Sequence, residues 1–201
     1  MFALVESGSI TKMLNGRRGI TIDGIQHPRA IYTLWTEAER NALGIYSIVY
    51  DDTNKKDEKW YINTNQSYAF GSGKVTATYG TATAKAHADT LYTAQDETDG
   101  LGTEGDVKVE GLKTKLIRDV KLEAANELAK TDWYVVRKSE ESTAIPSAIT
   151  THRRLVRTKA AAMETSITNA SDTPALETLY TYTTDSDGVH SRPLGELPTL
   201  E

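Results

Sequence analysis

Side chains that could perform catalysis or hold a metal are present, but they are not grouped. The four histidines, His27, His87, His152 and His190, are scattered, and no two have the spacing that a metal site on a helix or turn requires. The acidic turn at residues 51–58 lacks the order of ligands and the glycine of a calcium-binding EF-hand loop. Gly71 and Gly73 lack the spacing of a phosphate-binding loop. We therefore expect no catalytic residue, no metal ligand and no cofactor, and a protein that is not an enzyme.

A basic segment is the strongest local signal for binding. Its four cations are Arg153, Arg154, Arg157 and Lys159. On a helix, Arg153 and Arg157 share one face. Nucleic acid is disfavoured as a partner because a wider basic field and stacking aromatic residues are missing. Two interpretations stay open: the arginines pair with carboxylates of a partner protein, or they pair internally across a helical hairpin. The acids available for internal pairing are Asp119, Glu123 and Glu127.

The basic segment belongs to the second of two predicted helices. Residues 112–130 carry one apolar stripe, formed by Leu116, Ile117, Val120, Ala124 and Leu128. Residues 147–169 repeat an apolar residue every seven positions, and this seam comprises Ile149, Val156 and Met163, with Ala160 and Ile167 beside them. These patterns predict a helical hairpin. The secondary structure of the apolar cluster at residues 133–136, between the helices, stays open.

The first half of the chain has the pattern of an antiparallel β-rich domain. Asp23-Gly24 separates two short β-branched runs, which is a strong hairpin signal. Residues 71–73 mark another hairpin, and residues 45–50 are rich in β-branched and aromatic side chains. Thr36 and Glu39 form a predicted capping box that starts one short helix, and Gly44 is the expected stop.

Composition limits the remaining possibilities. The 201 residues include no cysteine, which excludes disulfides and thiolate chemistry, and the formal net charge is −5. No apolar run approaches the roughly 20 residues of a membrane-spanning helix, and no signal peptide is recognisable. We therefore expect a soluble protein of a reducing cytoplasm, with no nucleic-acid or membrane partner.

The predicted fold class is α+β, with a small antiparallel β-rich N-terminal domain containing one short helix, followed by a C-terminal α-helical hairpin region. We expect the β-rich domain at 1–92 and a flexible acidic linker at 93–108, because that stretch has few large apolar residues. A long loop within one domain is the alternative for this stretch. The helical hairpin region is expected at 109–170, and the C-terminal tail at 171–201 is expected to add one strand.

Residues 128–138, 144–149 and 153–157 together resemble the C-terminal segment of tail-fibre assembly proteins of tailed bacteriophages. The matching positions are Asp132, Trp133, Arg137, Ile145, Pro146, Arg153 and Arg157. The sequence departs from that pattern at residues 139–142, where a turn glycine is missing. Residues 34–46 also resemble, more weakly, the N-terminal part of small phage tail proteins.

The resemblance implies a chaperone that binds the tail-fibre protein and assists its folding and trimerisation in the host cytoplasm. It leaves open whether the protein stays in the virion tail and whether it forms a homo-oligomer. The alternative is a permanent structural part of the tail, such as a fibre adaptor or a baseplate accessory protein. The expected partner-binding residues are Trp133, Tyr134, Arg137, Ile145, Arg153 and Arg157. For Trp133 and Tyr134 the alternative is an internal core between the helices.

Overall fold

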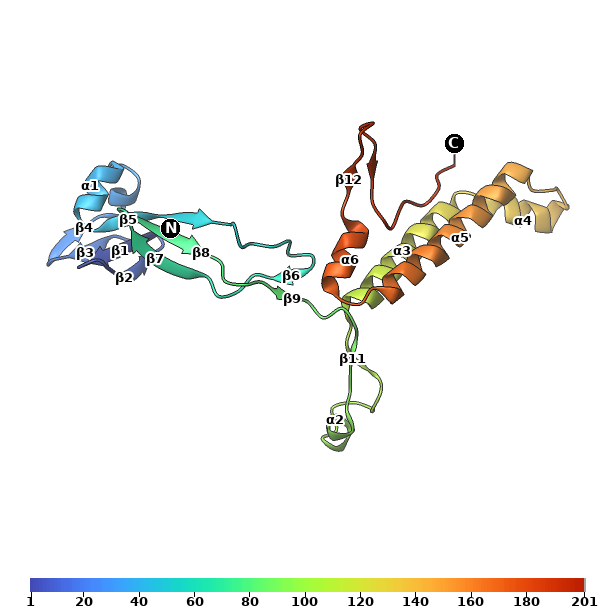
Figure 1. Cartoon of the computed structure of the whole chain (residues 1–201), viewed down its shortest axis with the longest axis horizontal. Coiled ribbons are helices and arrows are strands. Elements are labelled where there is room, and N and C mark those ends of the chain that lie inside the picture. The colour runs from blue at the N-terminus through green and yellow to red at the C-terminus, as the bar shows by residue number, and fades with distance from the viewer. Residues whose placement is uncertain (201) are drawn as a thin grey trace. The chain divides into compact units, whose positions relative to one another are not determined.

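The computed structural model describes residues 1–200 of a mixed α+β chain (Figure 1). The chain divides into two compact units, Met1–Thr83 and Ala84–Glu201. The boundary therefore falls after residue 83, whereas the sequence predicted it near residue 92. Each unit has its own buried core.

Unit 1 contains a mixed five-stranded sheet and short accessory elements. Its elements are β1 (Phe2–Glu6), β2 (Ser9–Leu14), β3 (Ile20–Ile22), β4 (Ile25–His27), the 3-10 helix Arg29–Tyr32, α1 (Glu37–Ala42), β5 (Ile45–Asp51), β6 (Tyr61–Ile62), β7 (Ser67–Gly71) and β8 (Lys74–Thr78). The main sheet has the order β2-β1-β5-β8-β7, and β3 pairs with β4. The strand β9 (Thr83–Ala84), which spans the division, pairs with β6.

The local signals for turns and caps in unit 1 are confirmed. Asp23 and Gly24 both have positive φ, as a tight two-residue hairpin requires. The capping box of α1 forms as predicted: the Thr36 side chain accepts from the Glu39 amide, and the Glu39 carboxylate accepts from the Thr36 amide. Gly44 follows α1 with a φ of +75°.

The expectation of a purely antiparallel sheet is wrong at one pair of strands. β5 and β8 run parallel, with Ile48 opposite Val75. The reason lies in the turn at Ser72 and Gly73, which reverses the chain after β7 and inserts β8 between β7 and β5. Because β8 is antiparallel to β7, which returns toward the start of β5, β8 has the same direction as β5.

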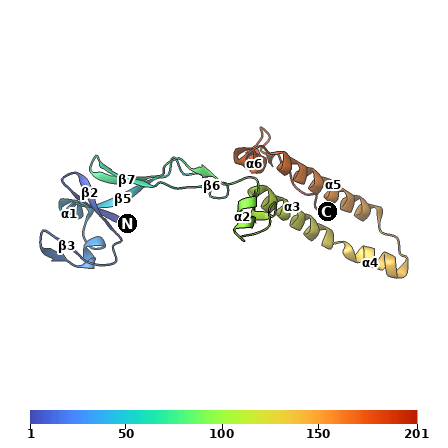
Figure 2. The ribbon, with the colours of Figure 1, turned by 90° about the horizontal axis from the view of Figure 1, so that it is seen from below.

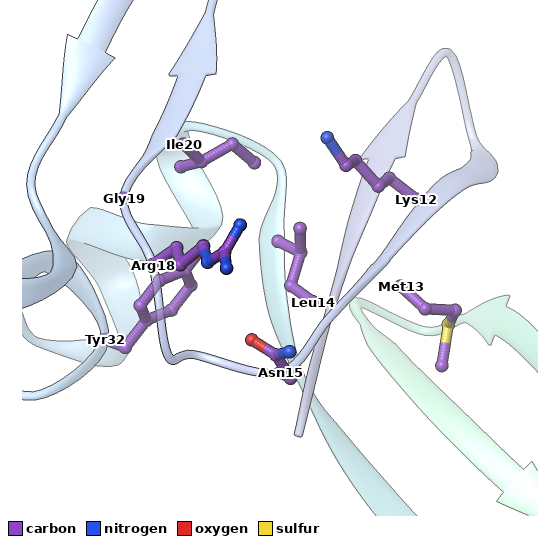
Figure 3. A pocket seen from close by; sticks show the side chains of 8 residues that line it. All are labelled: Lys12, Met13, Leu14, Asn15, Arg18, Gly19, Ile20 and Tyr32. Atoms are coloured by element: carbon purple, nitrogen blue, oxygen red, sulfur yellow. The ribbon is translucent and has the colours of Figure 1, made fainter.

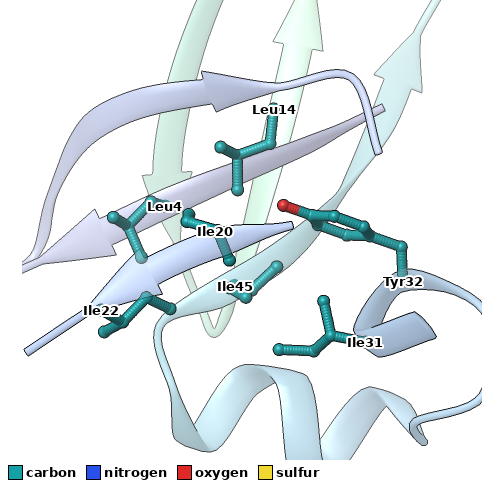
Figure 4. Packing of buried hydrophobic residues seen from close by; sticks show 7 residues of the cluster. All are labelled: Leu4, Leu14, Ile20, Ile22, Ile31, Tyr32 and Ile45. Carbon is teal, nitrogen blue, oxygen red and sulfur yellow. The ribbon is translucent and has the colours of Figure 1, made fainter. Parts of the chain in front are cut away.

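Alternation along the central strands builds a core on each face of this sheet. Leu4 and Ile45 belong to one cluster, which also includes Leu14, Ile20, Ile22, Ile31 and Tyr32 (Figure 4). Ala3, Val5, Ile48, Val75 and Ala77 form the cluster on the opposite side.

Unit 2 is dominated by two long helices that lie side by side (Figure 2). Its elements are β10 (Thr90–Leu91), α2 (Ala94–Thr98), β11 (Val107–Val109), α3 (Leu112–Ala129), α4 (Asp132–Glu141), α5 (Ser147–Asn169), α6 (Thr173–Tyr180), β12 (Thr183–Thr184) and β13 (His190–Ser191). The helices α3 and α5 match the predicted ranges closely. The predicted seam of α5 is confirmed, since Ile149, Val156, Ala160, Met163 and Ile167 are all buried.

Two segments of unit 2 differ from the expectation. Residues 93–108, expected as a flexible linker, include α2 and the start of β11. A capping box of Thr93 and Asp96 begins α2, and Lys108 reaches Asp96 at 2.6 Å. The tail at 171–201, expected to add one strand, contains the helix α6 and the two short strands β12 and β13, which pair with each other. The Asp172 side chain accepts from the Ala175 amide, and Pro174 lies in the first turn, where its missing N–H costs nothing.

Candidate protein-binding site

Helix α4 follows α3 after a short junction at Lys130 and Thr131. The Thr131 amide and hydroxyl both donate to the Leu128 carbonyl at 3.0 Å and so close the last turn of α3. Asp132 then lies in the first turn of α4, where a carboxylate is favoured by the helix dipole. The far end of α4 stops at Ser142, which has a left-handed φ of 60°. The structure thereby settles the secondary structure of residues 133–136 as helical.

The junction places three of the expected binding residues together on α4. The rings of Trp133 and Tyr134 lie 3.7 Å apart between centroids, with an interplanar angle of 30°. The Arg137 guanidinium carbon lies 4.8 Å from the Trp133 ring centroid and 5.4 Å from that of Tyr134. Trp133 and Arg137 are four residues apart, so they are neighbours on one helix face. We call Trp133, Tyr134 and Arg137 the aromatic–guanidinium cluster.

This cluster belongs to a helix that has no share in the core. None of the ten residues of α4 is buried. Trp133 is 51% exposed, and the adjacent Val135 and Val136 are 44% and 53% exposed. The alternative that Trp133 lies in a core between the helices is therefore wrong for the chain by itself. Trp133, Val135 and Val136 each expose apolar area to solvent on α4, and Arg137 adds a cation beside the Trp133 ring.

Arg153 lies elsewhere, and its assignment to a partner-binding face is corrected. The residue is 8% exposed. Its Nη1 donates to the Leu128 carbonyl and to the Thr131 hydroxyl, each at 2.7 Å, and lies 2.8 Å from Asp132 Oδ1. Arg153 thus fastens α5 to the junction between α3 and α4. The interpretation of internal pairing is correct for this residue, but the acid is Asp132.

The two remaining expected residues are not joined to the cluster by any contact that the structure records in residues 1–200. Arg157 is exposed, and its Nη1 lies 3.5 Å from the Arg153 carbonyl oxygen. Ile145 is half-buried in the loop before α5. Of the six expected residues, three form one surface, one is structural and two lie apart from that surface.

The pairing of Glu127 with a histidine inside the hairpin was not expected from the sequence. The His152 Nε2 and Glu127 Oε1 atoms lie 3.2 Å apart, and both residues are buried. Lys130 donates to the other Glu127 oxygen, and this hydrogen bond holds the pKa of the Glu127 carboxyl below its usual value. The signal was available in the sequence, because His152 lies three residues after Ile149 and four before Val156, on the seam side of the helix.

Other kinds of site find no support in residues 1–200. Those residues contain no group of three or more His, Cys, Asp or Glu side chains that could hold a metal ion. None of their helices combines the length and apolarity needed to cross a membrane. Comparisons with models of protein families, with characterised proteins and with solved structures find no match to the chain.

Proposed function

We propose that the protein is a non-enzymatic assembly chaperone of a bacteriophage tail fibre, and that it binds the fibre polypeptide through α4. The observation that carries this proposal is a ten-residue helix that buries none of its residues yet displays Trp133, Val135 and Val136 to solvent. This helix lies within the segment whose residues resemble tail-fibre assembly proteins.

The composition of the exposed surface supports a protein partner. Tryptophan, tyrosine and arginine are the residues that most often dominate the energy of protein interfaces. Holding a tryptophan and two valines half exposed is unfavourable, and a partner would remove that apolar area from water. The stacked guanidinium is pre-oriented on the rings, so less side-chain entropy is lost when it binds.

The charges of this region indicate what the partner presents. Arg137, the cation of the aromatic–guanidinium cluster, forms no ion pair within the described chain. Arginine pairs with carboxylates through two parallel hydrogen bonds. We therefore propose that the bound fibre segment combines apolar side chains with aspartate or glutamate.

A chaperone role fits the physics of fibre folding. Fibre chains assemble through long-range β pairing, which is slow and leaves strand edges exposed to aggregation. A bound protein that covers such a segment would keep it soluble until the three chains meet. No covalent chemistry is required for this role.

The direct test is co-expression with the product of the neighbouring fibre gene, followed by co-purification and measurement of affinity. We expect Trp133→Ala to weaken binding by about 30-fold, corresponding to about 2 kcal/mol. The matched control is Leu122→Ala, because Leu122 is 60% exposed on α3 of the same unit. It should bind like the wild type, and both variants should melt like the wild type.

The same experiment separates the chaperone from an adaptor. A chaperone makes the co-expressed fibre soluble and trimeric, and Trp133→Ala loses that effect. An adaptor leaves fibre folding unchanged and is present in virions at fixed stoichiometry. Equal loss of binding in Trp133→Ala and Leu122→Ala, or normal binding by Trp133→Ala, would contradict the assignment of the site to α4.

A further inference from the structure

Unit 1 contains a pocket that the proposed function does not use. It lies between β2 and the start of β3, has a volume of about 240 Å³, and is lined by Lys12, Leu14, Asn15, Arg18, Ile20 and Tyr32, among others (Figure 3). Leu14 and Ile20 are buried members of the unit's core, so they give the pocket an apolar floor. The volume suits a group the size of one amino acid.

The walls of the pocket carry unpaired positive charge. Figure 3 shows the Lys12 ammonium and the Arg18 guanidinium pointing toward one another across Leu14. Neither side chain has an ion pair or a hydrogen bond within residues 1–200. The surrounding sequence cannot neutralise them, because no acid occurs between Glu6 and Asp23. Lys12 and Arg18 are both exposed side chains that line the pocket, and two cations beside an apolar floor favour an anion there.

Two neutral donors add to this site. The Asn15 side-chain oxygen already accepts from the Arg17 amide at 2.9 Å, which leaves the Asn15 NH₂ group to donate. Tyr32 is 7% exposed, and its hydroxyl has no hydrogen-bond partner within the described chain. The phenol is protonated at neutral pH, and burial raises its pKa further, so the hydroxyl is able to donate a hydrogen bond.

From this arrangement we infer that unit 1 binds a small carboxylate that carries an apolar group. The carboxylate pairs with Arg18 and Lys12, and the apolar group lies on Leu14 and Ile20. A carboxylate matches the planar fork of arginine, and the apolar floor disfavours a fully hydrated anion such as phosphate. Two ligands share this chemistry: a free aliphatic carboxylate, and the C-terminus of a polypeptide that ends in an apolar residue.

The test is titration of the full chain, with methyl NMR of Leu14 and Ile20 as the readout and N-acetyl-leucine as the probe, up to about 20 mM. We expect saturable shifts of both methyl signals. N-acetyl-leucinamide, which lacks the carboxylate, should give none. Absence of saturation with N-acetyl-leucine, or equal binding of the amide or of inorganic phosphate, would overturn the inference.

Variants test the roles of the two cations. Arg18→Gln and Lys12→Gln should each weaken binding of N-acetyl-leucine by about fivefold. Arg17→Gln is the matched control, because Arg17 is an adjacent cation that does not line the pocket. The affinity of this variant for N-acetyl-leucine should stay within about twofold of the wild type. Equal losses in all three variants would indicate a diffuse electrostatic effect and would refute a built site.

A final arm identifies the source of the carboxylate. A pentapeptide ending in leucine that binds about tenfold more tightly than N-acetyl-leucine would assign the pocket to a polypeptide C-terminus. Equal affinity would assign it to a free small carboxylate. This test uses only unit 1 residues, so its outcome is independent of fibre binding through α4.

Discussion

Helices α4 and α5 are neighbours in the chain and both carry arginine beside apolar residues, yet they use these residues in opposite ways. On α5, Arg153 is buried and bonded to Leu128, Thr131 and Asp132. On α4, Arg137 stacks on two rings, one of which is half exposed to solvent. Both side chains are arginines, so the difference in role comes from whether the position belongs to a buried apolar seam.

The seam of α5 explains this difference. Ile149, Val156 and Met163 recur every seven residues, and the positions four residues after each of them also face α3. Arg153 is four residues after Ile149, so it occupies a core position that Ala160 and Ile167 occupy in the next two repeats. Because α3 ends at Ala129, its last carbonyls lie where the guanidinium can bind them. Helix α4 has no such seam, and its side chains remain available.

The largest expected effect comes from opening a cavity in the seam. Met163 is 1% exposed, and Met163→Ala should lower the free energy of unfolding by about 3.5 kcal/mol. The matched change on α4 is Val136→Ala at a residue that is 53% exposed, and it should cost less than about 0.5 kcal/mol. Urea denaturation measures both. A cost for Val136→Ala comparable to that of Met163→Ala would mean that α4 is packed in the free protein.

Removing the buried arginine should have the next largest effect. Arg153→Ala removes the hydrogen bonds that Arg153 donates to the Leu128 carbonyl and the Thr131 hydroxyl, together with its ion pair to Asp132, and should cost about 2.5 kcal/mol in unfolding free energy. Arg157→Ala is the control from the same helix, since Arg157 is exposed, and its cost should be near zero. If the two substitutions have equal cost, Arg153 does not fasten the helices.

The apolar periodicity predicted both helices of the hairpin. The same periodicity puts Arg153 on the buried face of α5 if its charge is ignored. The five seam residues of α5 are apolar and lie seven, four, three and four residues apart, which keeps them on one helix face, so their burial followed directly from the sequence. Arg153 occupies the same register, but its charge led to its assignment to a partner-binding face, with internal pairing as the alternative. The secondary structure of α4 was ambiguous for a different reason. The residues from Trp133 to Val136 are of types favoured in strands, but the turn at Thr131 and Asp132 starts a helix there.

Other errors arose where the determining contact is distant or was overlooked. Strand alternation is the same in parallel and antiparallel pairs, so the direction of β8 beside β5 was not encoded locally. The capping box at Thr93 was harder to recognise than the one at Thr36, because its third residue is Asp96 where the usual pattern has glutamate or glutamine, and because the surrounding segment is acidic and polar. Asp172 and Pro174 marked the start of α6 in the same way. The pocket at Arg18 depends on β2, β3 and Tyr32 coming together, which no local pattern predicts.

Acid should destabilise the hairpin by protonating Glu127, with a smaller effect on the free energy of unfolding than Arg153→Ala. Its folded-state pKa is held below the usual value by Lys130, so the unfolded chain binds the proton more readily. The contribution of Glu127 is therefore full above about pH 5 and is lost as the pH falls through its folded pKa. Urea midpoints of the wild type and Glu127→Gln should converge between about pH 5 and pH 3.

The control for the pH effect is Glu123→Gln, on the exposed side of α3, since Glu123 has no ion pair in residues 1–200. Its midpoint should follow that of the wild type at every pH. A constant difference between the wild type and Glu127→Gln across the same range would show that the carboxylate of Glu127 is not stabilising.

The smallest effect concerns the turn that ends α4. Ser142 has a φ of 60°, a left-handed conformation that disfavours residues with a Cβ atom. Ser142→Gly relieves this strain but loosens the unfolded chain, so a net gain of about 0.5 kcal/mol is expected. Ser139→Gly, inside the same helix, should lose about 0.5 kcal/mol instead. Opposite signs in urea denaturation would show that α4 ends at Ser142 in solution, and equal losses would show that it does not.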